Sequence, residues 1–195
     1  MSVVNSEPGS LAPIDLLMTR ASAVRLAEPG PTREQIERIL AAAVTAADHG
    51  RIRPWRFVVM QGEGRKRLGD LMADVQRAKS PDISEAELEK TRAKALRAPV
   101  VIALVCQGDK AHKVPLFEQQ LAAAAAGAHL MLAAKALGFG SNWKTGSAAH
   151  DPIVRTGLGF GADDAIIGFF HIGTEPQPSP LPRASTDSIV QYWLD

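Results

Sequence analysis

The residues best suited to chemistry lie in one nine-residue segment, 138–146, which reads Gly-Phe-Gly-Ser-Asn-Trp-Lys-Thr-Gly. Glycine has no side chain, so it lets the backbone come close to a flat ligand. In the same segment Trp143 offers an aromatic face, Lys144 a positive charge and Thr145 a hydroxyl donor. This combination suits an aromatic ligand that also carries a phosphate group.

A second segment, Arg20-Ala21-Ser22, places a cation and a hydroxyl two residues apart at the end of the first expected helix. The guanidinium fork of arginine binds phosphate oxygens through charged hydrogen bonds. Arg20 taken alone could equally complement the negative end of a helix, a contribution of about 0.3–1 kcal/mol. Trp143 taken alone is more often a core aromatic than the wall of a binding site.

Other motifs of catalysis or binding are incomplete. Gly62-Glu63-Gly64 lies between an expected strand and an expected helix, as in a dinucleotide-binding fingerprint, but Arg67 stands where the third glycine should be. A Gly-x-Ser-x-Gly nucleophile elbow does not occur in the sequence. The histidines lack the spacing of metal ligands, so we expect no metal site. They are His49, His112, His129, His150 and His171.

The composition excludes several broad classes of protein. With 195 residues, of which 46% are hydrophobic, the chain is long enough for one domain with its own core. It has 22 basic and 21 acidic residues, a net charge of +1, whereas nucleic-acid binders usually carry a strong basic excess. The single cysteine, Cys106, ends an apolar run, which excludes an intrachain disulfide and fits a reducing cytoplasm.

Neither a signal peptide nor a membrane span is expected from the sequence. Residues 1–12 are polar and lack the basic start and apolar centre of a signal peptide, so we expect a flexible tail. The longest apolar stretch, Leu121–Phe139, is alanine-rich and contains His129 and Lys135. A membrane span needs about 20 strongly apolar residues. We therefore expect a cytoplasmic protein with a single domain over residues 13–195.

Periodicity and capping signals predict that an α+β domain positions these residues. Thr32 with Gln35, and Ser84 with Glu87, have the spacing of capping boxes at helix starts. The longest helix is apolar all round, so we expect it to be buried at the centre of the domain or of a dimer. The expected helices are 13–20, 32–48, 65–79, 84–97, 115–137 and one from Pro152; the expected strands are 55–60, 100–106, part of 138–146 and 166–172, followed by an extended tail over 176–182.

Four segments resemble, in order, sequence blocks of the nitroreductase family. Leu17–Leu26 resembles the opening Arg-Arg-Ser motif, and Asp48–Phe57 resembles the block that ends in Gln-Pro-Trp-His-Phe. Phe139–Gly146 resembles the Trp-Arg-Ser-Gly block of the YdjA-type branch of small nitroreductases, and Ile166–Thr174 matches the ending of that branch. No block is specific alone, but order and spacing hold from about residue 14 to residue 174.

The resemblance implies a nitroreductase-like three-layer fold of class α+β, with a mixed central sheet flanked by helices. It also implies a homodimer with FMN at the subunit interface and residues of both chains around each flavin. The phosphate or ribityl chain would be contacted by Arg20, Ala21 and Ser22. From the partner subunit, the flavin would be approached by Thr45 and His49. The other wall would consist of Trp143, Lys144 and Thr145, with Lys144 as a second phosphate or ribityl cation.

The implied activity is that of an FMN-dependent oxidoreductase. It would take hydride from NAD(P)H and reduce nitroaromatic, quinone-like or related acceptors by a ping-pong mechanism. The flavin supplies the chemistry, so we nominate no catalytic residue. Three alternatives stay open: a flavin-storage or delivery protein, another flavin reaction on the same fold, and a structural domain without flavin.

Two departures from the family pattern bear on the site. Ala21 replaces the second arginine of the Arg-Arg-Ser motif, which removes one cation. Arg53 stands where the family often has glutamine; arginine only donates hydrogen bonds, whereas an amide also accepts them. Whether Arg51 or Arg53 reaches the flavin ring, or points to solvent, is left open by the sequence.

Overall fold

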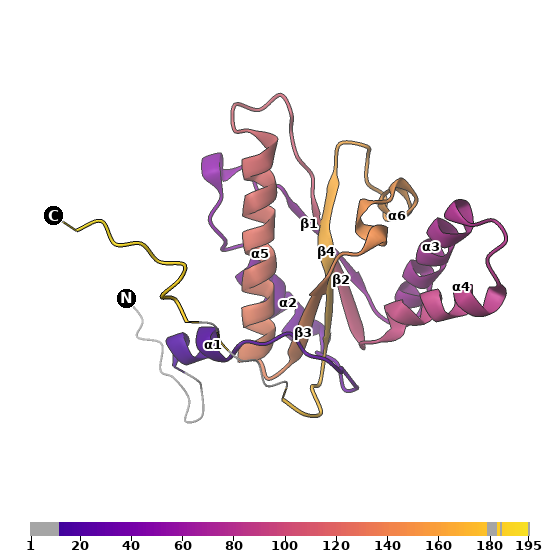
Figure 1. Cartoon of the computed structure of the whole chain (residues 1–195), viewed down its shortest axis with the longest axis horizontal. Coiled ribbons are helices and arrows are strands. Elements are labelled where there is room, and N and C mark those ends of the chain that lie inside the picture. The colour runs from indigo at the N-terminus through magenta and orange to yellow at the C-terminus, as the bar shows by residue number, and fades with distance from the viewer. Residues whose placement is uncertain (1–11, 179–182, 184, 195) are drawn as a thin grey trace.

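The computed structural model describes residues 12–178, 183 and 185–194. The tail expected over 1–12 therefore lies outside the described residues except for Ala12, and so does part of the expected extended segment 176–182. A four-stranded sheet lies between two layers of helices (Figure 1). Its spatial order is β1-β2-β4-β3, with β1 at Trp55–Met60, β2 at Val100–Cys106, β4 at Ala165–Gly173 and β3 at Gly140–Lys144.

The described sheet is antiparallel throughout, so the expectation of a mixed sheet is corrected for this part of the chain. Both β2 and β3 are antiparallel to β4, so they run in the same direction as each other. Two such strands would form a parallel pair if they were neighbours. Here β4 is inserted between them, so no parallel pair forms among the described strands.

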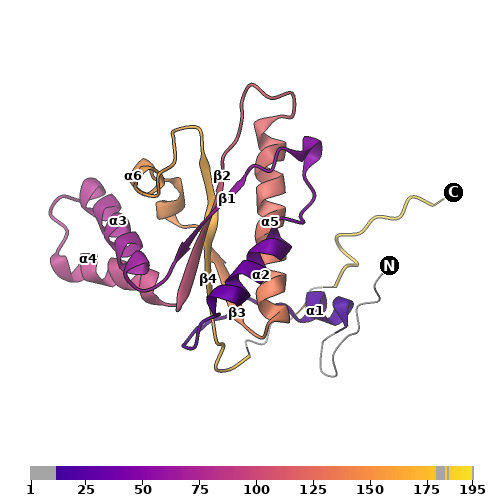
Figure 2. The ribbon, with the colours of Figure 1, turned by 180° about the vertical axis from the view of Figure 1, so that it is seen from behind.

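Helices cover both faces of the sheet, which gives the expected three layers (Figures 1 and 2). The long helix α5 (Leu116–Ala136) and α2 (Arg33–Ala43) pack on one face, around Ile39, Leu130 and Phe170. On the other face, α3 (Glu63–Lys79) and α6 (Pro152–Gly157) enclose a second core cluster. The remaining elements are α1 (Pro13–Thr19), α4 (Glu85–Arg92) and the 3₁₀ turns η1 (His49–Arg51), η2 (Ala93–Leu96) and η3 (Ser147–His150).

Both predicted capping boxes are present. The Thr32 hydroxyl accepts a hydrogen bond from the Gln35 N–H at 3.3 Å, and the Gln35 side chain accepts from the Thr32 N–H at 2.9 Å. Ser84 and Glu87 make the same reciprocal pair. The helix expected over 84–97 is shorter as an α-helix, because it tightens after Arg92 into η2.

The long helix α5 is buried on one side only. Gly127 and Leu130 face the sheet, and the close approach depends on glycine, because a Cβ at residue 127 would lie 2.5 Å from Phe170. On the opposite side, Phe117 is 66% exposed and Leu121 is 52% exposed. Burial on all sides is therefore not achieved within one chain. Of the helices in the described part of the chain, none has the length and hydropathy that a membrane crossing requires.

Candidate functional site

Strand β3 forms an edge of the described sheet, and the segment after α1 runs along it. The Ala23 N–H donates to the Ser141 carbonyl at 2.9 Å, and the Asn142 side-chain amide donates to the Ala23 carbonyl at 2.9 Å. Further along, Ala27 and Thr174 exchange two backbone hydrogen bonds. The segment 20–27 is thereby fixed against the sheet.

The backbone of Trp143 points out of this edge. In an antiparallel sheet, successive residues of a strand direct their N–H and C=O groups alternately to the two neighbouring strands. Ser141 directs its carbonyl outward to Ala23, so Trp143, two residues later, also directs its N–H and C=O outward. Outside the sheet ladders, no backbone hydrogen bond to these two groups exists within the described part of the chain. They are available to a ligand that lies along the edge.

The side chains of Trp143 and Lys144 point to opposite faces of the sheet, as consecutive strand residues must. The Trp143 ring packs on Phe170, with ring centroids 4.9 Å apart, and its Nε1–H donates to the Ile167 carbonyl at 3.1 Å. The ring also covers Gly168, where a Cβ would lie 2.0 Å from the Trp143 Nε1. The Lys144 side chain lies on the face covered by α3.

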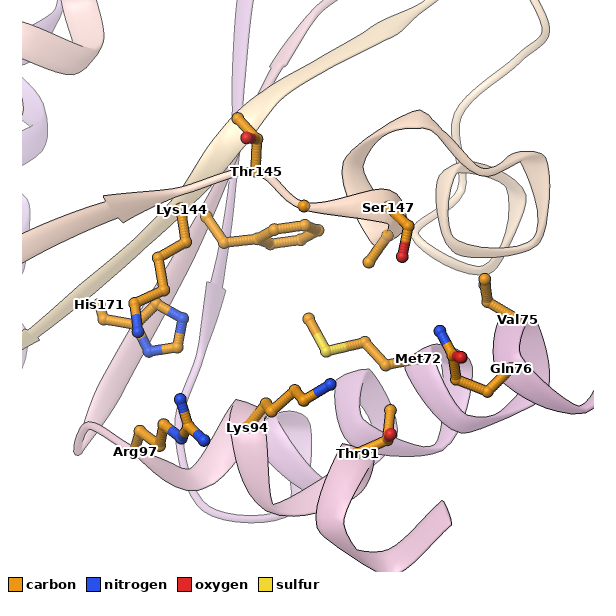
Figure 3. A pocket seen from close by; sticks show the side chains of 13 residues that line it. Met72, Val75, Gln76, Thr91, Lys94, Arg97, Lys144, Thr145, Ser147 and His171 are labelled. Atoms are coloured by element: carbon orange, nitrogen blue, oxygen red, sulfur yellow. The ribbon is translucent and has the colours of Figure 1, made fainter. Parts of the chain in front are cut away.

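Two adjoining cavities lie on the Lys144 side, each of about 290 Å³. Arg97, Lys144 and His171 line both of them, so we treat the two as one groove. One half, shown in Figure 3, lies between the sheet and α3, and its lining includes the apolar side chains of Met72, Val75 and Phe169. The other half is lined by residues 23–26 and the β3 edge. We call this the cationic groove, after Arg25, Lys94, Arg97 and Lys144, which line it.

The cationic groove has unbalanced positive charge. None of its described lining residues is an aspartate or glutamate. Its four cations form no ion pair within the described residues, unlike Arg92, which bonds Asp70, Glu85 and Glu89. A concave site lined by one sign of charge attracts ligands of the opposite sign. The groove is therefore suited to an anionic or polarised ligand.

His171 lies in the wall shared by the two halves and is only 4% exposed. Its Nδ1 is buried and has no hydrogen-bond partner within the described residues. Burial lowers the pKa of His171 to about 4, and the positive charges of Lys144 and Arg97 contribute to the shift. The imidazole is therefore neutral at pH 7.

The structure divides the predicted site residues into three groups. Lys144 and Thr145 line the cationic groove. Arg20, Ser22 and Trp143 line a different cavity of about 430 Å³, on the α5 side of the sheet. Ala21 and Arg20 also line a small cavity of about 70 Å³ that reaches Lys135. The segment 20–26 joins the first two groups, because it crosses the β3 edge from one cavity to the other.

Thr45 and His49 form the third group and lie against α5. The Thr45 hydroxyl is 3.2 Å from Nδ1 of His129, and His49 Nδ1 is 2.6 Å from a carboxylate oxygen of Glu118. Neither residue lines the cavities described above. A single chain therefore does not bring Thr45 and His49 to the other predicted residues.

Arg51 and Arg53 lie in the exposed loop beyond His49. Both have left-handed backbone conformations, with φ of 55° and 53°. The Arg53 N–H donates to an Asp48 carboxylate oxygen at 2.6 Å, which holds this turn. Neither arginine lines the cationic groove of its own chain.

The groove also holds three cations and one histidine that the sequence pattern did not single out as site residues: Arg25, Lys94, Arg97 and His171. The two cations around η2 belong to a charged helical stretch, which is typical of a solvated surface. His171 did carry a signal, because it is the one titratable side chain in the otherwise apolar run 166–172. Buried polar side chains are usually hydrogen-bonded, so a histidine at such a position indicates a hydrogen-bond partner or a ligand.

Comparison with known proteins agrees with the sequence blocks. The sequence model of the family described as "Nitroreductase family" matches residues 25–174. The Escherichia coli (strain K12) protein named "Putative NAD(P)H nitroreductase YdjA" is 39% identical over 173 residues, covering 89% of this chain and 91% of that protein. A Haemophilus influenzae protein named "Putative NAD(P)H nitroreductase" is 38% identical over 162 residues, covering 83% and 87%.

Solved structures share the fold. A nitroreductase-like family protein from Bacillus cereus superposes with a TM-score of 0.80 at 22% identity, covering 96% of this chain and 99% of that chain. A Desulfovibrio desulfuricans protein described as "a putative nitroreductase in complex with fmn" gives a TM-score of 0.75 at 19% identity, covering 95% of this chain and 99% of that chain. The predicted α+β nitroreductase-like fold is confirmed. Because the family model matches residues 25–174 and two relatives are more than 30% identical to this chain, the chain belongs to the nitroreductase family.

Proposed function

We propose that this protein is an FMN-dependent oxidoreductase that takes hydride from NAD(P)H and passes two electrons to nitroaromatic, quinone-like or related acceptors in a ping-pong reaction. Relatives at 38–39% identity are named as NAD(P)H nitroreductases, and a structure of the same fold is an FMN complex. The observation that carries the proposal for this chain is the cationic groove beside an open strand edge.

The groove fits the chemistry of a flavin. An isoalloxazine ring system has an apolar dimethylbenzene end and a polar pyrimidine end. Met72, Val75 and Phe169 supply apolar surface for a ring, whereas Lys94, Arg97 and Lys144 supply hydrogen-bond donors for carbonyl oxygens. The outward N–H of Trp143 adds a backbone donor at the edge. Ligand sites of this kind are mostly apolar with a few placed polar groups.

An extended FMN molecule can also account for the division of the site between two faces. Arg20 and Ser22 would hold the phosphate on the α5 side, where charge-assisted hydrogen bonds to phosphate are strong. The ribityl chain would follow residues 23–25 over the β3 edge, and the ring would enter the cationic groove. Lys144, predicted as a phosphate or ribityl cation, is better placed for the ring.

When bound, FMN would supply the hydride and electron transfer chemistry. The residues of this chain would bind it, orient it and set the charge around it. Lys94, Arg97 and Lys144 would stabilise negative charge at the polar end of the ring, since they have no competing carboxylate in the groove. No general base is assigned, because hydride transfer to the flavin requires none from the protein.

A second copy of the chain would complete the site. Exposed and half-buried apolar side chains on α5 recur at spacings of four and three residues, which places them on one helix face. This stripe comprises Phe117, Leu121, Ala124, Ala128 and Leu132, and its far end lines the same cavity as Arg20 and Ser22. A partner packed on this stripe would bring its own Thr45 and His49 region toward the flavin. The homodimer is thus part of the proposed function.

The test is FMN affinity measured by titration of flavin-free protein. Arg20→Ala and Lys144→Met should each weaken FMN binding by about 1.5–3 kcal/mol, as expected for loss of a charged hydrogen bond. Lys90→Met is the matched control, because Lys90 is an exposed lysine on α4 that does not line the groove. No measurable FMN affinity in the unmodified protein would contradict the proposal. Equal affinity in the Lys144 variant would remove Lys144 from the site.

A further inference from the structure

His171 is the one buried titratable side chain in the wall of the cationic groove. It extends from β4 in the wall that the two halves share, and Figure 3 shows the side chains of Lys144 and Arg97 on either side of it. Its Nδ1 has no hydrogen-bond partner among the described residues, although the side chain is 4% exposed. A buried imidazole normally has a partner for at least one ring nitrogen. Nothing in the proposed binding of FMN explains why a titratable group stands here.

The charged groups around His171 are all positive. Lys144 faces it from β3, Arg97 from the chain after η2, and Lys94 and Arg25 line the halves on either side. The α3 residues of the groove, Met72, Val75 and Gln76, carry no charge, and the cross-strand neighbours of His171 are Val101 and Asn142. With the groove empty of anions, a proton on His171 would therefore add a further positive charge to an uncompensated cluster.

Negative charge placed in the groove would reverse this situation. It would neutralise part of the field of Lys144 and Arg97, and it would attract a proton directly. A nearby opposite charge favours the charged form of a titratable group. By linkage, a ligand whose binding raises the pKa of His171 must bind more tightly at low pH than at high pH.

We propose that His171 is the proton-accepting wall of the cationic groove, so that negative charge added to the flavin ring between Lys144 and Arg97 is matched by one proton held on its imidazole. This inference rests on the proposed function. Hydride from NAD(P)H carries two electrons and one proton, so flavin held in the groove would gain one negative charge. At a pH below its raised pKa, His171 would take up one proton from solvent to balance that charge, and it would release the proton when the acceptor removes the electrons. His171 would thus act through the proton that it holds beside the flavin, and it would donate no hydride.

The sign of the effect is fixed by the pKa of His171. Its pKa of about 4 in the flavin-free protein lies below the ordinary histidine value of 6.5, so the imidazole is neutral above pH 6.5. Negative charge on the reduced flavin would raise this pKa. At a pH below the raised pKa, proton uptake by His171 would then stabilise the complex with reduced FMN. The preference for reduced over oxidised FMN should therefore grow as the pH falls.

The experiment follows the pKa of His171 by NMR in protein labelled at histidine Cε1, with the resonance assigned by its absence in His171→Gln. The measurement is made on flavin-free protein, on the oxidised FMN complex and on the complex reduced anaerobically with dithionite. We expect the pKa to lie near 4 without flavin and to rise by about two units on reduction. Lys144→Met should raise the pKa in the flavin-free protein, because it removes one positive neighbour.

A second readout uses the ratio of affinities for reduced and oxidised FMN, obtained from midpoint potentials. At pH 5.5 this ratio should be at least threefold higher in the unmodified protein than in His171→Gln, and at pH 8 the two proteins should agree. His150→Gln, at an exposed histidine outside the groove, is the control. If FMN binds but neither the pKa nor the ratio responds to reduction, the inference is overturned and the proposed function stands. If FMN does not bind at all, both are overturned.

Discussion

Trp143 and Lys144 show how a single residue step decides the role of a side chain. Sequence adjacency and the family block place both on one wall of the cofactor site. Strand alternation instead sends Trp143 into the α5-side core, where Phe170 and the Ile167 carbonyl hold it, and sends Lys144 into the cationic groove. Trp143 can therefore contact a cofactor along the strand edge through its backbone, while its ring stabilises the sheet.

The pH dependence of stability is a prediction at this same scale. In the unfolded chain His171 has an ordinary pKa near 6.5, whereas in the fold its pKa is about 4. Between these values the unfolded chain binds more protons, so the free energy of unfolding should fall as the pH drops from about 6.5 to about 4. At about 1.4 kcal/mol per pKa unit, the loss reaches roughly 3 kcal/mol.

Urea unfolding of the flavin-free protein at a series of pH values measures this. His171→Gln, which keeps a polar side chain but cannot titrate, should lose distinctly less stability over the interval. His150→Gln should behave as the unmodified protein, because that side chain is exposed. Identical slopes for all three proteins would show that His171 titrates normally in the fold.

At the scale of the elements, local signals in the sequence located the helices and strands but not the groove. The capping boxes at Thr32 and Ser84 and the apolar run of β2 were sufficient, because caps and periodicity are local properties. Lys94 and Arg97 reach Lys144 only after α3 and α4 pack as a pair beside the sheet. No local pattern encodes that packing, so the groove could not be read from the sequence.

The capping box of α2 gives an element-scale prediction. Thr32→Ala removes the acceptor for the Gln35 N–H and should lower the free energy of unfolding by about 1 kcal/mol, within the usual range of about 0.5–2. Thr32→Ser retains the hydroxyl and should lose much less. The check is chemical denaturation of both variants at pH 7. Equal stability of the alanine and serine variants would mean that the cap contributes nothing measurable.

At the scale of the whole molecule, one chain holds an incomplete site. Arg20 and Ser22 lie beside the exposed apolar stripe of α5, while Thr45 and His49 are held against α5 by His129 and Glu118. The chain after β4 also exposes large apolar side chains, among them Tyr192 and Trp193. Exposed apolar surface on this scale is typical of a protein that associates. The cytoplasmic location and the single-domain boundary at residue 13 stay predictions.

Association should be visible in the mass of the particle. Light scattering should give a mass near twice 20.8 kDa at micromolar concentration. Leu121→Glu should place charge in the centre of the apolar stripe, produce monomers and weaken FMN binding at the same time. Ala78→Glu, at an exposed position on α3 across the sheet, should do neither. A monomeric Leu121→Glu variant with undiminished FMN affinity would contradict the shared site.

The most direct test of the central claim is an anaerobic absorbance spectrum of purified protein reconstituted with FMN, recorded before and after NADPH or NADH. We expect flavin bands at about 370 and 450 nm that bleach with the nicotinamide and return when a nitroaromatic or quinone is added. Bound flavin that neither nicotinamide reduces would point to storage or to other flavin chemistry. A spectrum with no protein-bound flavin would contradict the assignment of an FMN-dependent oxidoreductase.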